Sequence, residues 1–276
     1  MLAFVHIEKC AGTTLKSILR ANFGFRYAEV RPLSPASERT FRPADLRYYR
    51  RLNPLLGCIV GHSVKPWANL ESVVPDIRYI TLLREPVQRY LSYYRYGGGR
   101  HRKPWPFSFE QYLEMEPFRN FQVRKLAGCE DLEAAIRILE ERFLLAGDMA
   151  EFDEFVCLLQ ATYTPKRLDI RYKRLNESRR PADDPLLTAH RDSIEAANSL
   201  DLALYRHLHE VLLPRARAAY PGDLASAVDA FQRDAAPSRL KRAFGAAAWR
   251  LQQRLLLGPV TGRARRRAGL PAAGQY

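Results

Sequence analysis

The chain has 276 residues, 47% of them hydrophobic, and a formal net charge of +14. This length accommodates one α/β domain with a full core and an appendage. Its four cysteines form no CxxC pair, which argues against a zinc knuckle or a redox motif, and no apolar run approaches the ~18 residues of a membrane span.

The chain opens on a short apolar strand that runs into a polar loop. Residues 2–5 predict a buried strand, residues 8–12 a loop, and Thr13 begins a helical pattern. The N–H groups of such a turn and the helix dipole together attract anions, and Lys9 adds a full positive charge. The start of the chain therefore predicts a site for a phosphate or a group shaped like one.

Strands and helices alternate along the rest of the chain. An arginine-rich polar connection at 26–54 leads into the next strand, and a polar loop is expected at 163–186. Further strands are predicted at 56–60, 77–83 and 142–147, and helices at 86–96, 108–116, 119–127, 130–142, after the last strand up to 159, and at 198–219. This alternation predicts an α/β fold with a parallel sheet covered on both faces.

A second positive site follows the strand at 77–83. That strand ends in Arg84, where a phosphoryl-transfer enzyme usually carries an acidic residue for magnesium. The first loop also departs from the Walker A pattern, because Lys9 precedes Gly12 instead of following it. Two positive sites without a metal-binding acid predict a ligand that carries two separate phosphate-like groups.

Positive charge is concentrated near the C-terminus. Residues 233–276 hold ten basic residues against one aspartate, and so carry +9 of the total charge. Apolar residues at helical spacing between these arginines predict a basic amphipathic helix, which either lies on an anionic membrane surface or packs on its own domain. The RARRR segment at 263–267 is expected to be disordered. We divide the chain into a domain at 1–222 and a basic, partly helical extension at 223–276.

Six segments resemble sulfotransferases that use 3′-phosphoadenosine 5′-phosphosulfate (PAPS), specifically their carbohydrate (heparan-type) branch. FVHIEKCAGTTL is similar to the 5′-phosphosulfate loop, and LLREPVQRYLSYYRY to the 3′-phosphate motif. The other four follow in the expected order: GHS at 61–63, NFQVRKLAG at 120–128, AGDMAEFDEFVCLL at 146–159 and NSLDLALY at 198–205. The resemblance covers residues 2 to about 220.

The resemblance implies a P-loop-kinase-like three-layer sandwich and in-line transfer of sulfonate from PAPS to a carbohydrate hydroxyl, without a metal. It implies that Arg84 and Ser92 bind the 3′-phosphate and that His62 is the general base. Lys9 would stabilise the leaving phosphate. The residues expected to hold the phosphosulfate are Lys9, Cys10, Ala11, Gly12, Thr13 and Thr14.

Several positions depart from the family or remain open. Glu8 replaces the usual proline, and is expected to point away from the sulfonate or to pair with an arginine; it is the second candidate for the base. His6 is expected to be structural, whereas Asn120 and Gln122 either contact ligand or serve helix packing. Asn198, Asp201 and Tyr205 are expected to be structural.

The sequence also gives expectations about the acceptor and about the location of the protein in the cell. The acceptor is a glycan or glycolipid, which the basic loop at 100–103 and Arg124 would attract if it is anionic. No nucleic acid is expected. The scattered thiols and the lack of a leader or anchor favour a bacterial, cytoplasmic enzyme, peripheral at the inner face of the membrane if its basic helix binds there. A nucleotide or small-molecule kinase and a non-catalytic polyanion-binding protein remain as alternatives.

Overall fold

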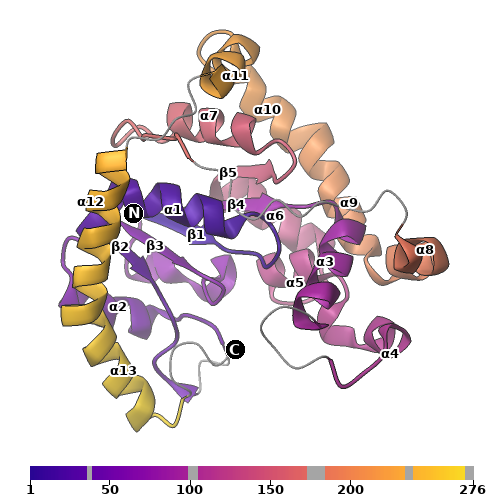
Figure 1. The fold of residues 1–276 in the computed structure, drawn as a ribbon, viewed down its shortest axis with the longest axis horizontal. Helices are drawn as coiled ribbons and strands as arrows, with labels where there is room; N and C mark the ends of the chain where they lie inside the picture. The colour runs from indigo at the N-terminus through magenta and orange to yellow at the C-terminus, as the bar shows by residue number, and fades with distance from the viewer. Residues whose placement is uncertain (36–38, 99–104, 173–183, 234–238, 271–276) are drawn as a thin grey trace.

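The computed structural model describes residues 1–35, 39–98, 105–172, 184–233 and 239–270. At its centre is a five-stranded sheet in the order β2-β3-β1-β4-β5, with parallel pairing between all neighbours. Helices lie on both faces of this sheet (Figure 1), which confirms the α/β fold with a parallel sheet. The strands are β1 (Leu2–Val5), β2 (Tyr27–Glu29), β3 (Cys58–Gly61), β4 (Arg78–Leu83) and β5 (Phe143–Asp148).

The first strand of the chain is the middle strand of the sheet. Leu2, Ala3, Phe4 and Val5 have no exposed surface, and β1 pairs with β3 on one side and β4 on the other. Such a strand is covered on both faces, which explains its unbroken apolar sequence. The loop that leaves β1 therefore emerges at the centre of the sheet's carboxyl edge, where ligands of parallel sheets bind.

The helices match most of the predicted ones to within a few residues. They are α1 (Gly12–Phe23), α2 (Pro43–Leu52), α3 (Pro86–Gly98), α4 (Phe109–Glu114), α5 (Phe121–Ala127), α6 (Leu132–Arg142), α7 (Phe152–Thr162), α8 (Pro185–Ala197), α9 (Ser199–His207), α10 (Leu213–Ala218), α11 (Leu224–Arg233), α12 (Arg239–Gln252) and α13 (Gly258–Arg267). Short π-helical turns, η6 (Leu208–Leu212) and η7 (Gln253–Leu257), join α9 to α10 and α12 to α13.

Two stretches differ from the expectation. The connection at 26–54 is not merely polar, because it contains the edge strand β2 and the helix α2. Asp45, at the third position of α2, accepts hydrogen bonds from the N–H groups of Arg42 and Leu33 at 2.9 and 3.0 Å, which fixes the start of that helix. The expected loop at 163–186 ends in the first turn of α8, and its residues 173–183 lie outside the described part of the chain.

The C-terminal helices pack on the domain. α12 crosses the C-terminal end of α1 (Figure 1), so closely that a Cβ on Gly245 would come within 2.6 Å of the Ala21 Cα. The Gln252 side chain donates to the Phe25 carbonyl at 2.9 Å. No helix in the described ranges is long and apolar enough to cross a bilayer.

The RARRR segment differs from its expected disorder. Residues 263–267 form the last turns of α13, and the Arg265 side chain is 5% exposed and donates to the Pro32 carbonyl. Its charge also reaches Asp45 and Tyr49 of the domain. Because Pro32 and Arg265 are far apart along the chain, the run of arginines does not by itself indicate this contact.

Candidate active site

The loop between β1 and α1 is wound tightly over the start of the helix. Lys9 and Ala11 have left-handed backbone conformations, with φ of 71° and 51°, and the Ala11 carbonyl accepts from the N–H groups of Thr14 and Leu15. A Cβ on Gly12 would lie 1.7 Å from the His6 Nε2, so only glycine fits there. The loop therefore has the form of the predicted anion cradle, and Thr13 is exposed at the first turn of α1.

The side chains of Cys10, a predicted loop residue, and of His6, expected to be structural, do not face a ligand. The Cys10 thiol is 1% exposed and faces the Gln122 Oε1 at 3.8 Å, and burial raises its pKa to about 12. Burial and the neighbouring His62 lower the pKa of His6 well below its usual range. Cys10 thus has its backbone N–H to offer, and His6 supports the loop as a neutral ring.

Arg84 lies directly against this loop. One guanidinium nitrogen donates to the Lys9 carbonyl at 3.0 Å. The backbone of Arg84 is held by Gln122, whose amide accepts from the Arg84 N–H at 3.0 Å and donates to its carbonyl at 2.9 Å. Burial and the Arg84 charge lower the pKa of the Lys9 ammonium. The structure thus brings the two predicted cationic residues together, at the ends of adjacent strands.

Helix α3 carries Ser92 towards the same region. Lys9 Nζ lies 4.1 Å from the centroid of the Tyr96 ring, and that ring is 58% exposed. Ser92 is one turn before Tyr96 and shares its face of the helix. Ser92 is half-buried, and no hydrogen bond of its side chain is found within the described ranges. Tyr96 had no sequence signal beyond its place at the end of the LLREPVQRYLSYYRY segment.

Glu8, His62 and Lys125 form a charged cluster behind the loop. The Lys125 ammonium lies 2.9 and 3.1 Å from the two Glu8 oxygens, and the Lys125 side chain is 4% exposed. His62 Nδ1 lies 3.3 Å from Glu8 and 3.0 Å from the His6 carbonyl, and its ring stacks on His6 with centroids 3.9 Å apart. Of the two alternatives expected for Glu8, pairing with an arginine is therefore wrong, since its cationic partner is a lysine.

The charges in this cluster act on one another. Burial opposes ionisation of Glu8, but Lys125 and His62 outweigh it and hold the pKa of the carboxyl well below its usual range. Burial and the Lys125 charge lower the pKa of the Lys65 ammonium to about 7. Lys65 and Lys125 had no functional reading in the sequence, although both lie within or beside segments that resemble the family.

Residues of the segments 120–128 and 198–205 form hydrogen bonds that connect α5 and α9. The Asp201 carboxylate, fully buried, accepts from the Gln122 and Val123 N–H groups at 3.0 and 2.8 Å at the start of α5. In return the Asn120 side chain accepts from Leu200 N–H at 3.0 Å at the start of α9. The structural interpretation of Asn120 and Asp201 holds, and Gln122 serves the Arg84 backbone.

Arg124 and Tyr205 are engaged elsewhere. Arg124 forms ion pairs with Glu116 at 2.9 Å and Glu130 at 3.3 Å, so its charge is already partnered. The Tyr205 hydroxyl donates to Asp148 at 2.5 Å, which ties α9 to the end of β5. The basic loop at 100–103 lies outside the described residues.

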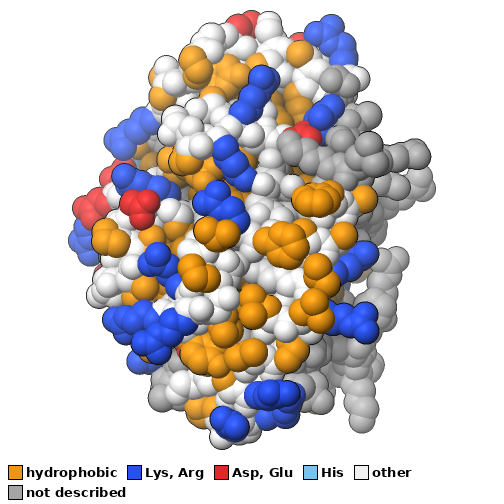
Figure 2. Space-filling model, turned by 90° about the vertical axis from the view of Figure 1, so that its left-hand side faces the viewer, with side chains coloured by type: hydrophobic (Ala, Val, Ile, Leu, Met, Phe, Trp, Pro, Cys, Tyr) orange, Lys and Arg blue, Asp and Glu red, His pale blue; other side chains and the backbone are white. Residues whose placement is uncertain are grey.

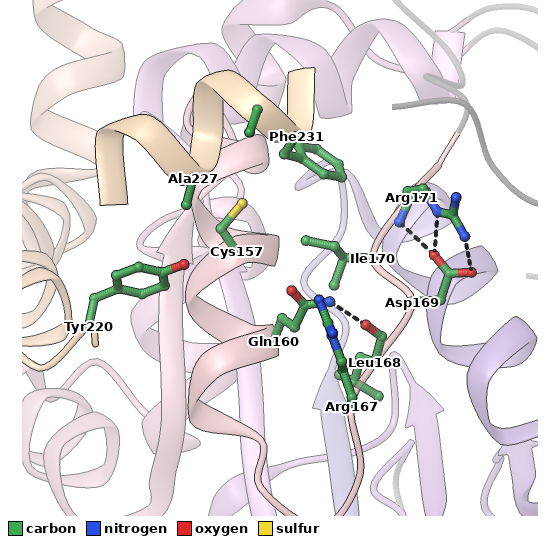
Figure 3. Close-up of a pocket in the computed structure, with 11 residues that line it drawn as sticks. Cys157, Gln160, Arg167, Leu168, Asp169, Ile170, Arg171, Tyr220, Ala227 and Phe231 are labelled. Atoms are coloured by element: carbon green, nitrogen blue, oxygen red, sulfur yellow. Dashed lines mark hydrogen bonds and ion pairs between the residues drawn. The ribbon is translucent and has the colours of Figure 1, made fainter. Parts of the chain in front are cut away.

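A cavity of about 460 Å³ lies between α7, α11 and residues 167–171 (Figure 3). Its rim includes the Asp169–Arg171 ion pair, and Asp169 accepts with its carbonyl from Asn22 near the end of α1. The loop between β1 and α1, residues 8–12, which we call the donor loop, lies at the other end of that helix, which is about 18 Å long for twelve residues. No predicted site residue lines this cavity.

Comparison with known proteins places this chain in a family. A family model described as "Sulfotransferase family" matches residues 1–178. Galactose-3-O-sulfotransferase 3 of Mus musculus is 29% identical over 244 residues, which are 75% of this chain and 55% of that protein. Its Bos taurus counterpart is 28% identical over 254 residues, 79% of this chain and 58% of that protein.

The chain thus spans little more than half the length of these relatives. The family match, in contrast, covers most of this chain and includes the donor loop, Arg84 and the Glu8 cluster. On this evidence the chain belongs to the sulfotransferase family.

Proposed function

We propose that this protein transfers sulfonate from PAPS to a hydroxyl of a carbohydrate acceptor of the galactoside class. The observation that carries the proposal is the placement of Lys9 and Arg84 against each other around the loop that follows β1. Family membership favours sulfonate over phosphate as the transferred group. The names of the similar proteins suggest galactose as the sugar.

The donor would bind across the two cationic positions. Backbone N–H groups of Cys10, Ala11 and Gly12, the hydroxyls of Thr13 and Thr14, and Lys9 would hold the phosphosulfate. Arg84 and Ser92 would hold the 3′-phosphate. The site suits such a polyanion because its acidic neighbours are engaged: Glu8 is paired with Lys125, and the Glu85 carboxylate accepts from the N–H groups of Val87 and Gln88 at the start of α3.

The chemistry is an in-line displacement at sulfur. The bond between sulfur and the bridging phosphate oxygen breaks while a bond between sulfur and the acceptor oxygen forms, and the acceptor's proton leaves to a base. Negative charge develops on the 5′-phosphate of the departing adenosine 3′,5′-bisphosphate, beside the Lys9 ammonium. Positioning and electrostatics therefore supply most of the catalysis.

We assign the role of general base, which takes the proton of the acceptor hydroxyl, to His62, and an orienting role to Glu8. The Nδ1 of His62 faces two acceptors, the Glu8 carboxylate and the His6 carbonyl, so it carries the ring proton. The Nε2 lone pair is then available to the acceptor hydroxyl, and the His62 side chain is 52% exposed. Glu8 is a poor base, because Lys125 and His62 stabilise its ionised form.

The direct test is to incubate the purified protein with PAPS and a panel of galactosides, and to read the products by mass spectrometry for added sulfonate. We expect transfer to at least one galactoside, unaffected by EDTA. Adenosine 3′,5′-bisphosphate should bind in a calorimetric titration. Absence of both transfer and bisphosphate binding would overturn the proposal, and activity restored by magnesium after EDTA would favour a kinase.

A further inference from the structure

The C-terminal helices present two different faces. One face is buried on the domain, and its residues recur at helical spacing: Ala248, Gln252, Leu257, Thr261 and Arg265. Beside this buried stripe, large apolar side chains stand in the open, namely Phe244 at 71% exposure, Leu251 at 49% and Leu255 at 67%. Packing on the domain therefore uses only half of this segment, and leaves an amphipathic surface outward.

Arginines lie among these apolar side chains. Arg250, Arg254, Arg263, Arg266 and Arg267 are exposed, and within the described ranges none of the five forms an ion pair. The sequence holds no acidic residue after Asp234. We call the exposed residues of α12, η7 and α13 the outer C-terminal face; Figure 2 shows this side of the molecule, with hydrophobic side chains bordered by basic ones.

The apolar surface continues onto the domain. Phe25 is 48% exposed and lies beside α12, since its carbonyl accepts from Gln252. Leu55 is 70% exposed, and its carbonyl accepts from the neighbouring Arg26. Large apolar side chains gathered on one face of a protein mark an interaction site more often than chance exposure does.

We propose that the outer C-terminal face binds an anionic membrane surface. The apolar side chains would enter the boundary between headgroups and acyl chains, and the arginines would contact lipid phosphates. A nucleic acid or a sulfated glycan would use the arginines alone and leave the Phe244, Leu251 and Leu255 side chains in water. A second copy of the same face would bring like charges together.

Helix α12 lies away from the donor loop. α12 contacts α1 near Ala21, in the second half of that helix, whereas the donor loop is at its first turn. The part of the outer C-terminal face on α12 therefore lies at the far end of α1 from the Lys9 loop. The inference does not depend on the proposed sulfonate transfer.

The test is co-sedimentation of the full chain with vesicles of phosphatidylcholine alone, or of equal parts phosphatidylcholine and phosphatidylglycerol. We expect binding to the anionic vesicles only. A triple variant Phe244→Ser/Leu251→Ser/Leu255→Ser should lower the partition coefficient at least tenfold. A triple variant Arg250→Gln/Arg254→Gln/Arg263→Gln should lower it further, since each arginine near the surface contributes about a fivefold change.

A matched control removes the same charge elsewhere. Arg137, Arg206 and Arg233 are exposed and lie outside the outer C-terminal face, so Arg137→Gln/Arg206→Gln/Arg233→Gln should bind vesicles as the parent does. All variants should keep the circular dichroism spectrum and melting temperature of the parent, which shows that they fold. Failure to bind anionic vesicles would overturn the proposal. So would an apolar variant that binds as well as the parent, because that result indicates a general affinity for polyanions.

Discussion

The Lys9 ammonium should act mainly on the transition state. Lys9→Ala keeps a Cβ at this left-handed position, so the backbone conformation of the loop is not changed by the substitution. We expect turnover to fall by on the order of 10²–10³-fold, because the lysine meets the negative charge that develops on the leaving phosphate. Bisphosphate affinity should change by much less. Equal losses of affinity and rate would show that Lys9 only binds the donor.

His62 and Glu8 can be separated by a double-mutant cycle. His62→Ala should lower turnover by about 10²–10⁴-fold, the usual value of general-base help. Glu8→Gln should lower it by on the order of 10²-fold, through misplacement of the imidazole, and should add nothing in the His62→Ala background. Bisphosphate binding serves as the control for folding. A Glu8→Gln effect that persists without His62, at unchanged bisphosphate affinity and melting temperature, would show that Glu8 does not act through His62.

Lys65 introduces a pH dependence of stability. Its pKa is about 7 in the folded protein and 10.5 as the ordinary value, so the unfolded chain binds more protons there between these two pH values. The free energy of unfolding therefore rises with pH across that window, and the burial penalty is fully present below it. Lys65→Met should stabilise the protein most below pH 7, with a gain that shrinks towards pH 10. A pH-independent gain in thermal melting would contradict this reasoning.

At the level of single residues, the sequence predicted those site residues that lie in family-like segments or directly after a strand. Lys9, Gly12 and Arg84 meet at one edge because parallel strands end there. The Glu8–Lys125 pair joins residues 117 positions apart, and nothing local to either residue indicates the other. The substitution of glutamate for proline was visible, but its partner was not.

Helices α5 and α9 form a unit that supports the site from outside it. Asp201→Ala would leave the buried N–H groups of Gln122 and Val123 without their acceptor, at a cost of about 1–3 kcal/mol each when such a group stays unpaired. We expect the free energy of unfolding to fall by about 2–4 kcal/mol in urea titrations. Asp201→Asn keeps one acceptor and should lose roughly half as much. Equal losses in the two variants would show that the hydrogen bonds contribute little.

The elements that could be predicted are those with an unbroken apolar signal. β1, β3 and β4 are inner strands and β5 is an edge strand, but all four are largely buried, and their sequences show it. β2 has only three residues, and α2 is rich in arginine with Leu46 and Tyr49 as its buried apolar residues. Their stability comes from the sheet edge and from the Asp45 hydrogen bonds, which no periodicity reveals.

The whole molecule should respond to a ligand that engages both cationic positions. Adenosine 3′,5′-bisphosphate at ~100 times its dissociation constant should add about 2.7 kcal/mol to the free energy of unfolding and raise the melting temperature. Adenosine 5′-monophosphate, which lacks the 3′-phosphate, should do so much less. Arg84→Ala should remove most of the difference between the two nucleotides, and equal stabilisation of the parent protein by both would contradict the two-position donor site.

Because α12 packs on α1, the fold joins a helix that is synthesised early to one that is synthesised late. Phe25 and Gln252 touch across 227 residues of chain, and synthesis at about 5–20 residues per second separates them by on the order of 10 to 45 seconds. Throughout that interval α1 has been synthesised, while α12, which packs against it, has not. A ribosome that stalls before residue 239 would release a chain whose first helix is still open to water along the Ala21 side, and such a chain is a natural target for chaperones and proteases.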